Sequence, residues 1–364
     1  MLRDTAIEVI DPAAAGSGGT LVKGVWPGVR MSRRGADADA GPTGVAWVDS
    51  NAWLARLTAA RHPGAVWIDA PPEGNRPGTP QQYLITMADS AAAGARWLIT
   101  LDNALAVGIA GRDPKSLAAW RRIGEASRFF AEHAGWAEWA PQAVVGVISD
   151  FAGTNEFMGQ ELLNLLDRAG QHYRIVFKNR MTADALTGLR AVLYADQDPP
   201  SAALRKQVLA FVESGGRLIT APVWGETPGK LSGPAAVPGY TERALGKGRV
   251  TMAAAAPDDP YVLANDSVVL VSHRYDLVRC WNSGAFWSYY TLAPDRARAT
   301  VQLLFYADRG PDAASVRVVG RWRKATISTI EEPAPMPVKL ETQGEAVEIY
   351  LPQVSQYAAL QLEG

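Results

Sequence analysis

The sequence predicts a mixed α/β protein whose last third is an antiparallel β-sandwich. Short apolar strands alternate with helices before Pro141, and the same alternation restarts there. From about Tyr261 the helical period gives way to short strand-like runs separated by Gly and Pro turns. We therefore expect domains at residues 1–140, 141–256 and 257–364, with residues from about 261 all β.

The first 64 residues are expected to supply strands and one helix. Candidate strands are residues 5–10, 21–26 and 44–49, and residues 53–60 have the spacing of a helix closed by His62-Pro63-Gly64.

The clearest pattern is a strand–helix–strand unit from Gly64 to Asp102. Ala65–Ile68 is an apolar run that ends before Pro71 and Pro72, which predicts a buried strand. Thr79, Pro80 and Gln82 form a helix start in which Gln82 can bond back to the cap. Trp97–Leu101 predicts a second strand. A carboxylate, Asp69 or Asp102, follows each strand, as in α/β enzyme sites.

The rest of the α/β region follows the same logic. We expect a loop over residues 103–112, a long helix after Asp113-Pro114, and about three βα units before Pro141. Beyond it, a parallel sheet is expected from strands at 143–149, 173–177, 190–195, 217–221 and 249–253. The helices between these strands are expected at 155–169, 182–189 and 201–214.

Composition narrows the function. The 36 Lys and Arg nearly balance the 37 Asp and Glu, so the net charge of −1 predicts neither nucleic acid nor membrane as partner. No apolar run could cross a bilayer, and no signal peptide precedes the strands, so a cytoplasmic location is expected.

The sequence predicts no metal and no cofactor. Cys280 is the only cysteine, and the four histidines share no ligand spacing. The Gly225–Leu231 segment has the wrong spacing for a phosphate loop. Cys280 also lies outside any strand-to-helix turn, so a glutaminase-type nucleophile is missing.

The remaining candidates for chemistry are Asp69, Glu73 and Asp102. Glycoside hydrolysis uses two carboxyl groups placed across the scissile bond, and tryptophan rings pack on the faces of sugars. The alternative is that Asp69 and Asp102 only cap loops and helix N-termini, and spacing alone favours that alternative.

Four segments carry a resemblance to a known family. They are Ala65-Val-Trp-Ile-Asp69-Ala-Pro-Pro, residues 83–102, Pro141-Gln-Ala-Val-Val-Gly-Val-Ile-Ser-Asp150, and Phe211-Val-Glu-Ser-Gly-Gly-Arg-Leu-Ile219. In this order they resemble the bacterial three-domain β-galactosidases of the (β/α)8 glycoside hydrolase clan. The resemblance implies the C-terminal part of a (β/α)8 barrel, a flavodoxin-like (glutamine-amidotransferase-like) domain and a β-sandwich.

The resemblance also implies a site. Asp69 stands where the family has its nucleophilic Glu on the seventh barrel strand, with Glu73 as a substitute. Residues that would line the sugar site are Trp67, Trp97, Asp102 and Asn103. A full barrel takes about 250 residues, and no strand-end Asn-Glu pair precedes Gly64, so we expect an incomplete or impaired glycoside hydrolase.

Two alternatives stay open at this stage. The competing class is a non-catalytic carbohydrate-binding or assembly protein, which a natural start at Met1 would favour. An upstream coding region with an Asn-Glu strand end would favour the enzyme. Open sheet edges also predict a homo-oligomer, an N-terminal part covered by its own first 45 residues, or an N-terminal part that is poorly ordered.

Overall fold

The computed structural model describes residues 19–30, 32–34, 37–39, 47–72, 78–182, 184–307 and 310–364. It confirms a mixed α/β protein with parallel and antiparallel sheets. The chain forms two compact units. Unit 1 comprises Met1–Pro141 with Val278–Gly364, and unit 2 comprises Gln142–Leu277. In the described part of the chain, no helix is both long enough and apolar enough to cross a membrane.

The N-terminal part of unit 1 is built on a three-stranded parallel sheet in the order β1-β6-β7. Its strands are β1 (Gly19–Lys23), β6 (Ala65–Asp69) and β7 (Arg96–Leu98). Two small antiparallel pairs accompany it, β2 (Gly28–Arg30) with β5 (Trp47–Asp49) and β3 (Ser32–Arg34) with β4 (Asp37–Asp39). The predicted strand at 5–10 and the candidate Glu73 lie outside the described residues.

The helices of unit 1 are α2 (Ala52–Arg61), α3 (Pro80–Ala92), α4 (Asn103–Ala110) and α5 (Pro114–Glu132), followed by the short η1 (Ala134–Glu138). The predicted capping box is present on α3: Thr79 accepts from the N–H of Gln82, and Gln82 accepts from the N–H of Thr79. The expected loop at 103–112 is wrong. Asp102 caps that segment, so it forms helix α4.

The C-terminal part of unit 1 consists of two antiparallel sheets. One has the order β16-β19-β23-β22 and the other β21-β20-β24-β18-β17-β8. The strands are β8 (Ala140–Pro141), β16 (Val278–Trp281), β17 (Phe286–Leu292), β18 (Arg298–Phe305), β19 (Ser315–Val319), β20 (Lys324–Thr329), β21 (Met336–Pro337), β22 (Leu340–Gln343), β23 (Ala346–Tyr350) and β24 (Tyr357–Glu363).

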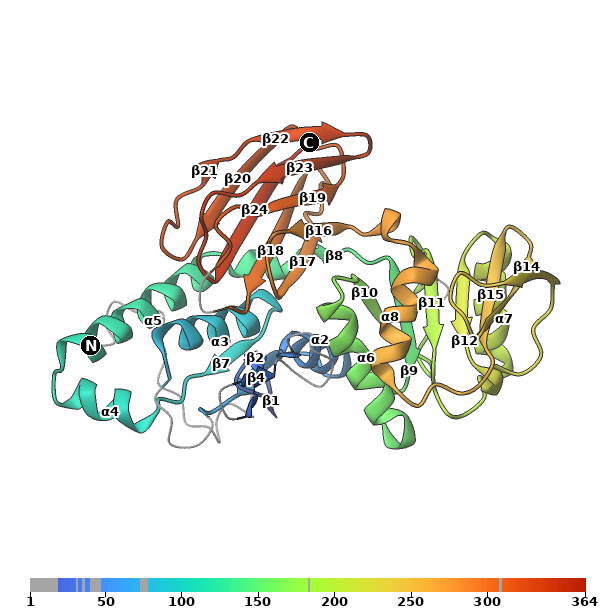
Figure 1. The fold of residues 1–364 in the computed structure, drawn as a ribbon, viewed down its shortest axis with the longest axis horizontal. Coiled ribbons are helices and arrows are strands. Elements are labelled where there is room, and N and C mark those ends of the chain that lie inside the picture. The colour runs from blue at the N-terminus through green and yellow to red at the C-terminus, as the bar shows by residue number, and fades with distance from the viewer. Residues whose placement is uncertain are drawn as a thin grey trace. The chain divides into compact units, whose positions relative to one another are not determined.

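Helix α3 joins the two parts of unit 1. It contacts β7 on one side and β18 on the other, as Figure 1 shows. Leu304, Tyr306 and Tyr357 of the antiparallel sheet share one hydrophobic core with Leu84 and Ile123 of the helices. Because α3 has apolar partners on both sides, it is buried around most of its circumference.

Unit 2 contains the predicted parallel sheet flanked by helices. Five parallel strands have the order β10-β9-β11-β12-β15, and antiparallel β14 and β13 extend the β15 edge. The strands are β9 (Val145–Ser149), β10 (Tyr173–Phe177), β11 (Ala191–Tyr194), β12 (Arg217–Thr220), β13 (Lys230–Pro234), β14 (Tyr240–Leu245) and β15 (Gly248–Ala253). Every residue of β9 and of β11 is buried, so both faces of the sheet are covered there.

The helices of unit 2 differ from the predictions in two places. They are α6 (Glu156–Arg168), α7 (Ala202–Glu213) and α8 (Pro260–Val271), with the short η2 (Gly153–Asn155), η3 (Pro222–Trp224) and η4 (His273–Tyr275). The expectation that residues from about 261 are all β is wrong, because α8 packs on α6 there. The helix expected at 182–189 is also wrong. Residues 184–188 form turns, and Arg174 donates hydrogen bonds to the carbonyls of Ala185 and Thr187.

Candidate functional site

The carboxyl end of β6 places Asp69 and Trp67 on one face of the parallel sheet. Val66 and Ile68 point to the other face and join the helix-covered core. Strands β1 and β7 flank β6 in register, with Lys23 beside Asp69 and Arg96 beside Trp67. The face that carries Asp69 is therefore the one that helices α2 and α3 do not cover.

Asp69 combines partial burial with a free carboxylate. Its backbone carbonyl accepts from the N–H of Gly24 at 2.9 Å. Its side chain has no hydrogen-bond or ion-pair partner in the part of the chain that the structure describes. A carboxylate at the carboxyl end of a central parallel strand is placed where α/β proteins bind ligands.

Trp67 is partly buried beside a cation. The guanidinium carbon of Arg96 lies 5.2 Å from the centre of the Trp67 ring, within the range of a cation–π contact. Trp67 and Arg96 pair across β6 and β7, and Asp69 and Leu98 form the next pair on the same face, two residues further along each strand. Trp67 and Asp69 are thus the two predicted site residues that the structure brings together.

Asp102 has a different role from the one expected of a sugar ligand. One carboxylate oxygen accepts from the N–H of Leu105 at 2.9 Å, which caps α4. The other accepts from the N–H of Gly78 at 3.0 Å and the hydroxyl of Tyr83 at 2.9 Å. Burial favours the neutral acid, but these hydrogen bonds outweigh it and hold the pKa of Asp102 below its usual range. Both oxygens are occupied within the fold.

Trp97 and Asn103 also lie apart from the Asp69 face. Trp97 is 8% exposed and points to the helix side, where its ring lies 5.8 Å from that of Trp26 and 5.9 Å from that of Tyr83. Asn103 is exposed at the first position of α4.

Sequence reasoning missed Tyr83. This side chain is fully buried, donates to the Asp102 carboxylate and accepts from the Asp102 N–H at 2.7 Å. Burial raises the pKa of the Tyr83 hydroxyl well above its usual value. In the sequence, Tyr83 has the spacing of an ordinary core residue near the start of α3, so no local signal identifies it as a partner of Asp102.

A second group of charges was also missed, in unit 2. Asp150, Asp196 and Asp198 follow β9 and β11, and Lys178 follows β10. The ammonium of Lys178 lies 2.7 Å from Asp150, 2.7 Å from Asp196 and 2.8 Å from Asp198. Asp150, Lys178 and Asp196 each directly follow a predicted strand, and Asp198 comes two residues after Asp196. This placement is the signal that could have found the group.

Lys178 forms ion pairs with all three carboxylates of this acidic group. Its three carboxylates can bring oxygens within 4.8 Å of one another, a donor set that suits a hard cation. Burial alone would lower the pKa of Lys178, but its hydrogen bonds to the three acids raise the pKa well above its usual value. The lysine therefore occupies the position that a cation would take.

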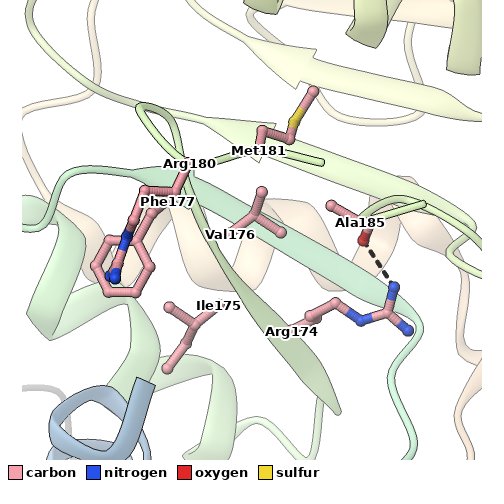
Figure 2. A pocket seen from close by; sticks show the side chains of 7 residues that line it. All are labelled: Arg174, Ile175, Val176, Phe177, Arg180, Met181 and Ala185. Atoms are coloured by element: carbon pink, nitrogen blue, oxygen red, sulfur yellow. Dashed lines mark hydrogen bonds between the residues drawn. The ribbon is translucent and has the colours of Figure 1, made fainter. Parts of the chain in front are cut away.

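A pocket of about 280 Å³ lies along β10 in unit 2. Figure 2 shows its two arginines engaged within the fold. Arg174 donates to the carbonyl of Ala185 at 2.7 Å, and the guanidinium of Arg180 lies 4.2 Å from the centre of the Phe177 ring. None of the predicted site residues lines this pocket.

Comparison with known proteins identifies the fold. No protein family profile matches the sequence. None of the curated proteins matches it either. Solved structures do match. The fold is that of β-galactosidase-type glycoside hydrolases.

Three of these structures show the extent of the similarity. The α-L-fucosidase isoenzyme 2 from Paenibacillus thiaminolyticus aligns with a TM-score of 0.58 at 12% identity, over 85% of this chain and 62% of its own. Gan42B, a GH42 β-galactosidase from G. stearothermophilus, aligns with a TM-score of 0.56 at 9% identity. The alignment covers 86% of this chain and 56% of Gan42B. The β-galactosidase from Bacillus circulans sp. alkalophilus aligns with a TM-score of 0.53 at 9% identity. The alignment covers 85% of this chain and 61% of that enzyme. This chain thus spans little more than half the length of each.

Proposed function

We propose that this chain is a carbohydrate-binding protein of the glycoside hydrolase type whose own residues form an impaired catalytic site. The observation that carries the proposal is the pairing of Asp69 with Trp67 on the face of β6 that helices α2 and α3 do not cover. The carboxylate of Asp69 has no hydrogen-bond or ion-pair partner among the described residues. That pairing occurs in a chain with a glycosidase fold. A carboxylate that accepts from sugar hydroxyls, next to an aromatic ring, is suited to bind a saccharide.

We also propose an architecture that places Asp69 and Trp67 where barrel enzymes have their sites. We take β1, β6 and β7 with α2 and α3 as the C-terminal part of a (β/α)8 barrel, in which sites lie at the carboxyl ends of the strands. The strand order of unit 2 is the flavodoxin-like order 2-1-3-4-5. The division at 1–140, 141–256 and 257–364 stays a proposal. Since unit 2 continues through α8 to Leu277, we move its second boundary there.

The proposed impairment rests on the carboxyl groups. Retaining glycosidases hold two carboxyl groups about 5 Å apart and inverting ones roughly 6.5–9.5 Å apart. Asp69 is one methylene shorter than the family's Glu. Asp102, the candidate partner that follows the neighbouring strand β7, has both oxygens occupied. This engagement of Asp102 also favours the second candidate function, a purely non-catalytic carbohydrate-binding or assembly protein. Outer strands β1 and β7 support the expected homo-oligomer.

The test is an assay of the purified chain with aryl β-galactosides and α-L-fucosides, together with calorimetric titration of galactose and fucose. We expect negligible turnover and weak binding, and the binding should be lost in Trp67→Ala and reduced in Asp69→Asn. Trp281→Ala is the matched control, because Trp281 is a 38% exposed tryptophan on the distant strand β16 and should bind like the parent.

Two results would contradict the proposal. Turnover far above background that disappears in Asp69→Asn would mean that the site is catalytically competent. Absence of saccharide binding in the parent chain would remove the carbohydrate function itself.

A further inference from the structure

Asp89 is a fully buried carboxylate in the middle of helix α3, with an exposed fraction of 0%. The groups that bond to it are neutral donors. One oxygen accepts from the hydroxyls of Ser50 at 2.8 Å and Tyr306 at 2.7 Å. The other accepts from the N–H of Asn51 at 2.6 Å. A buried carboxylate without a cation is costly to ionise, because it loses the hydration it has in the unfolded chain.

The donors come from two different parts of unit 1. Ser50 and Asn51 connect β5 to α2, whereas Tyr306 directly follows β18 of the antiparallel sheet. Asn51 continues the network by bonding to both the N–H and the carbonyl of Val25, at 2.7 and 2.8 Å. Nearby, Gln302 of β18 donates to the α3 carbonyl of Ala92 at 3.2 Å. Asp89 therefore lies where α3 meets the β-sandwich.

We propose that Asp89 is a proton-operated latch between helix α3 and the antiparallel sheets, closed when its carboxyl is neutral and loosened when the carboxyl ionises. In the neutral form the carboxyl O–H donates to Ser50 or Tyr306, since a hydroxyl can rotate to accept. The second oxygen still accepts from the N–H of Asn51. The neutral form keeps every hydrogen bond and buries no charge.

The pKa of Asp89 supports a latch that is closed in the neutral form. Burial raises the pKa of Asp89 from 3.8 to about 6, although hydrogen bonds from Tyr306, Asn51 and Ser50 oppose the rise. Because the folded pKa exceeds the unfolded one, the stabilisation is complete below pH 3.8 and is lost as the pH rises through about 6. This gap corresponds to a roughly hundredfold change in the opening equilibrium.

Among the described residues, no cation of the surrounding elements forms an ion pair with Asp89. Helix α5 packs on α3 with apolar residues such as Ile123 and Ala126. The guanidinium carbon of Arg56 on α2 lies 5.4 Å from the centre of the Tyr289 ring. The other titratable groups on the elements that pack on α3 are Arg61 on α2, Arg96 on β7, Arg298 on β18, and Lys115, Arg121, Arg122, Glu125, Arg128 and Glu132 on α5. Helix α3 itself carries Tyr83, and the neighbouring segments add Asp49, Tyr306 and Tyr357.

The latch is tested on the full chain by hydrogen exchange of α3 and β18 amides, comparing the parent with Asp89→Asn at each pH. An amide can satisfy the same partners without ionising. We expect the two proteins to be equally protected near pH 4. At pH 7.5 Asp89→Asn should be better protected, by up to about a hundredfold. Asp167→Asn is the control, a buried aspartate in unit 2 that accepts from Tyr173 at 2.8 Å.

Equal pH dependence in the parent and in Asp89→Asn would overturn the proposal, as would weaker protection of the variant at pH 7.5. A direct measurement does not depend on the variant folding well. In the parent chain, the ¹³C resonance of the Asp89 carboxyl should titrate with a midpoint near pH 6. A midpoint below pH 4 would refute the latch.

Discussion

Both carboxylate oxygens of Asp102 are already engaged within the fold, and this distinguishes it from Asp69. The two residues follow neighbouring strands of the same sheet and looked equivalent in sequence. Asp102 caps a helix and bonds to Tyr83 and Gly78, whereas the side chain of Asp69 has no partner within the described ranges of the chain. The difference arises from the fully buried Tyr83 ring, whose hydroxyl reaches the carboxylate of Asp102 but lies on a helix 19 residues earlier in the chain.

Asp102→Ala should destabilise unit 1 by about 2–3 kcal/mol, since it removes a helix cap and leaves the buried Tyr83 hydroxyl without its acceptor. Because the folded pKa of Asp102 lies below its usual value, this stabilisation is present above pH 4 and is lost as the pH falls below that. Urea unfolding at pH 7 and pH 3 measures both effects. Asp113→Ala, at the exposed cap of α5, should cost less. Equal losses at the two caps would contradict the special role of Asp102.

Local signals predicted where most elements begin, and they did so because those signals are physical contacts. The Thr79–Gln82 capping box is present, as are the N-caps at Asp113 and Ser201. Contacts between residues that lie far apart in the chain could not be predicted from local sequence signals. Arg174 bonds the carbonyls of residues 185 and 187 and so replaces the expected helix with turns.

The error at helix α8 had another cause. Its valines favour a strand by propensity, yet Asp259 caps the segment by accepting from the N–H of Tyr261 at 2.8 Å, and Pro260 occupies the first turn. The buried residues Leu263, Ala264, Ser267, Val268 and Val271 also follow helical spacing. The start signal and the helical spacing therefore outweigh the β-branched content of this segment.

At the level of one helix, Thr79→Ala should destabilise unit 1 by about 1 kcal/mol, because the N–H of Gln82 loses its acceptor at the start of α3. Thermal unfolding followed by circular dichroism measures the loss. Gln81→Ala, next to the box but not part of it, serves as control and should melt like the parent. If the two variants melt together, the capping box contributes nothing measurable.

At the scale of the molecule, the chain forms two compact units, and the sequence of unit 2 lies between the two segments of unit 1. The consecutive apolar residues Leu84 and Ile85 of α3 are both buried, so this helix is covered on two sides. Which sheet covered its second side was not predictable, because β18 lies more than two hundred residues away in sequence.

Fragments test this arrangement. Residues 142–277 alone should unfold cooperatively, because they contain a complete parallel sheet with its own core. Residues 1–141 alone should show no cooperative transition and should bind the dye ANS, since α3 and α5 would lose the antiparallel sheet that covers them. Co-expression with residues 278–364 should restore the transition. Cooperative melting of the 1–141 fragment alone would disprove the shared core.

The hydrogen bond between Asp89 and Tyr306 spans 217 residues, and this separation matters while the chain is being made. Ribosomes add roughly 5–20 residues per second, so Tyr306 is synthesised about 10–40 s after Asp89. In that interval the inserted unit 2 can fold completely, whereas helix α3 has no sheet to pack against on one side. We therefore expect nascent chains stalled before β18 to recruit chaperones through the first 141 residues, and release of the finished chain to end that binding.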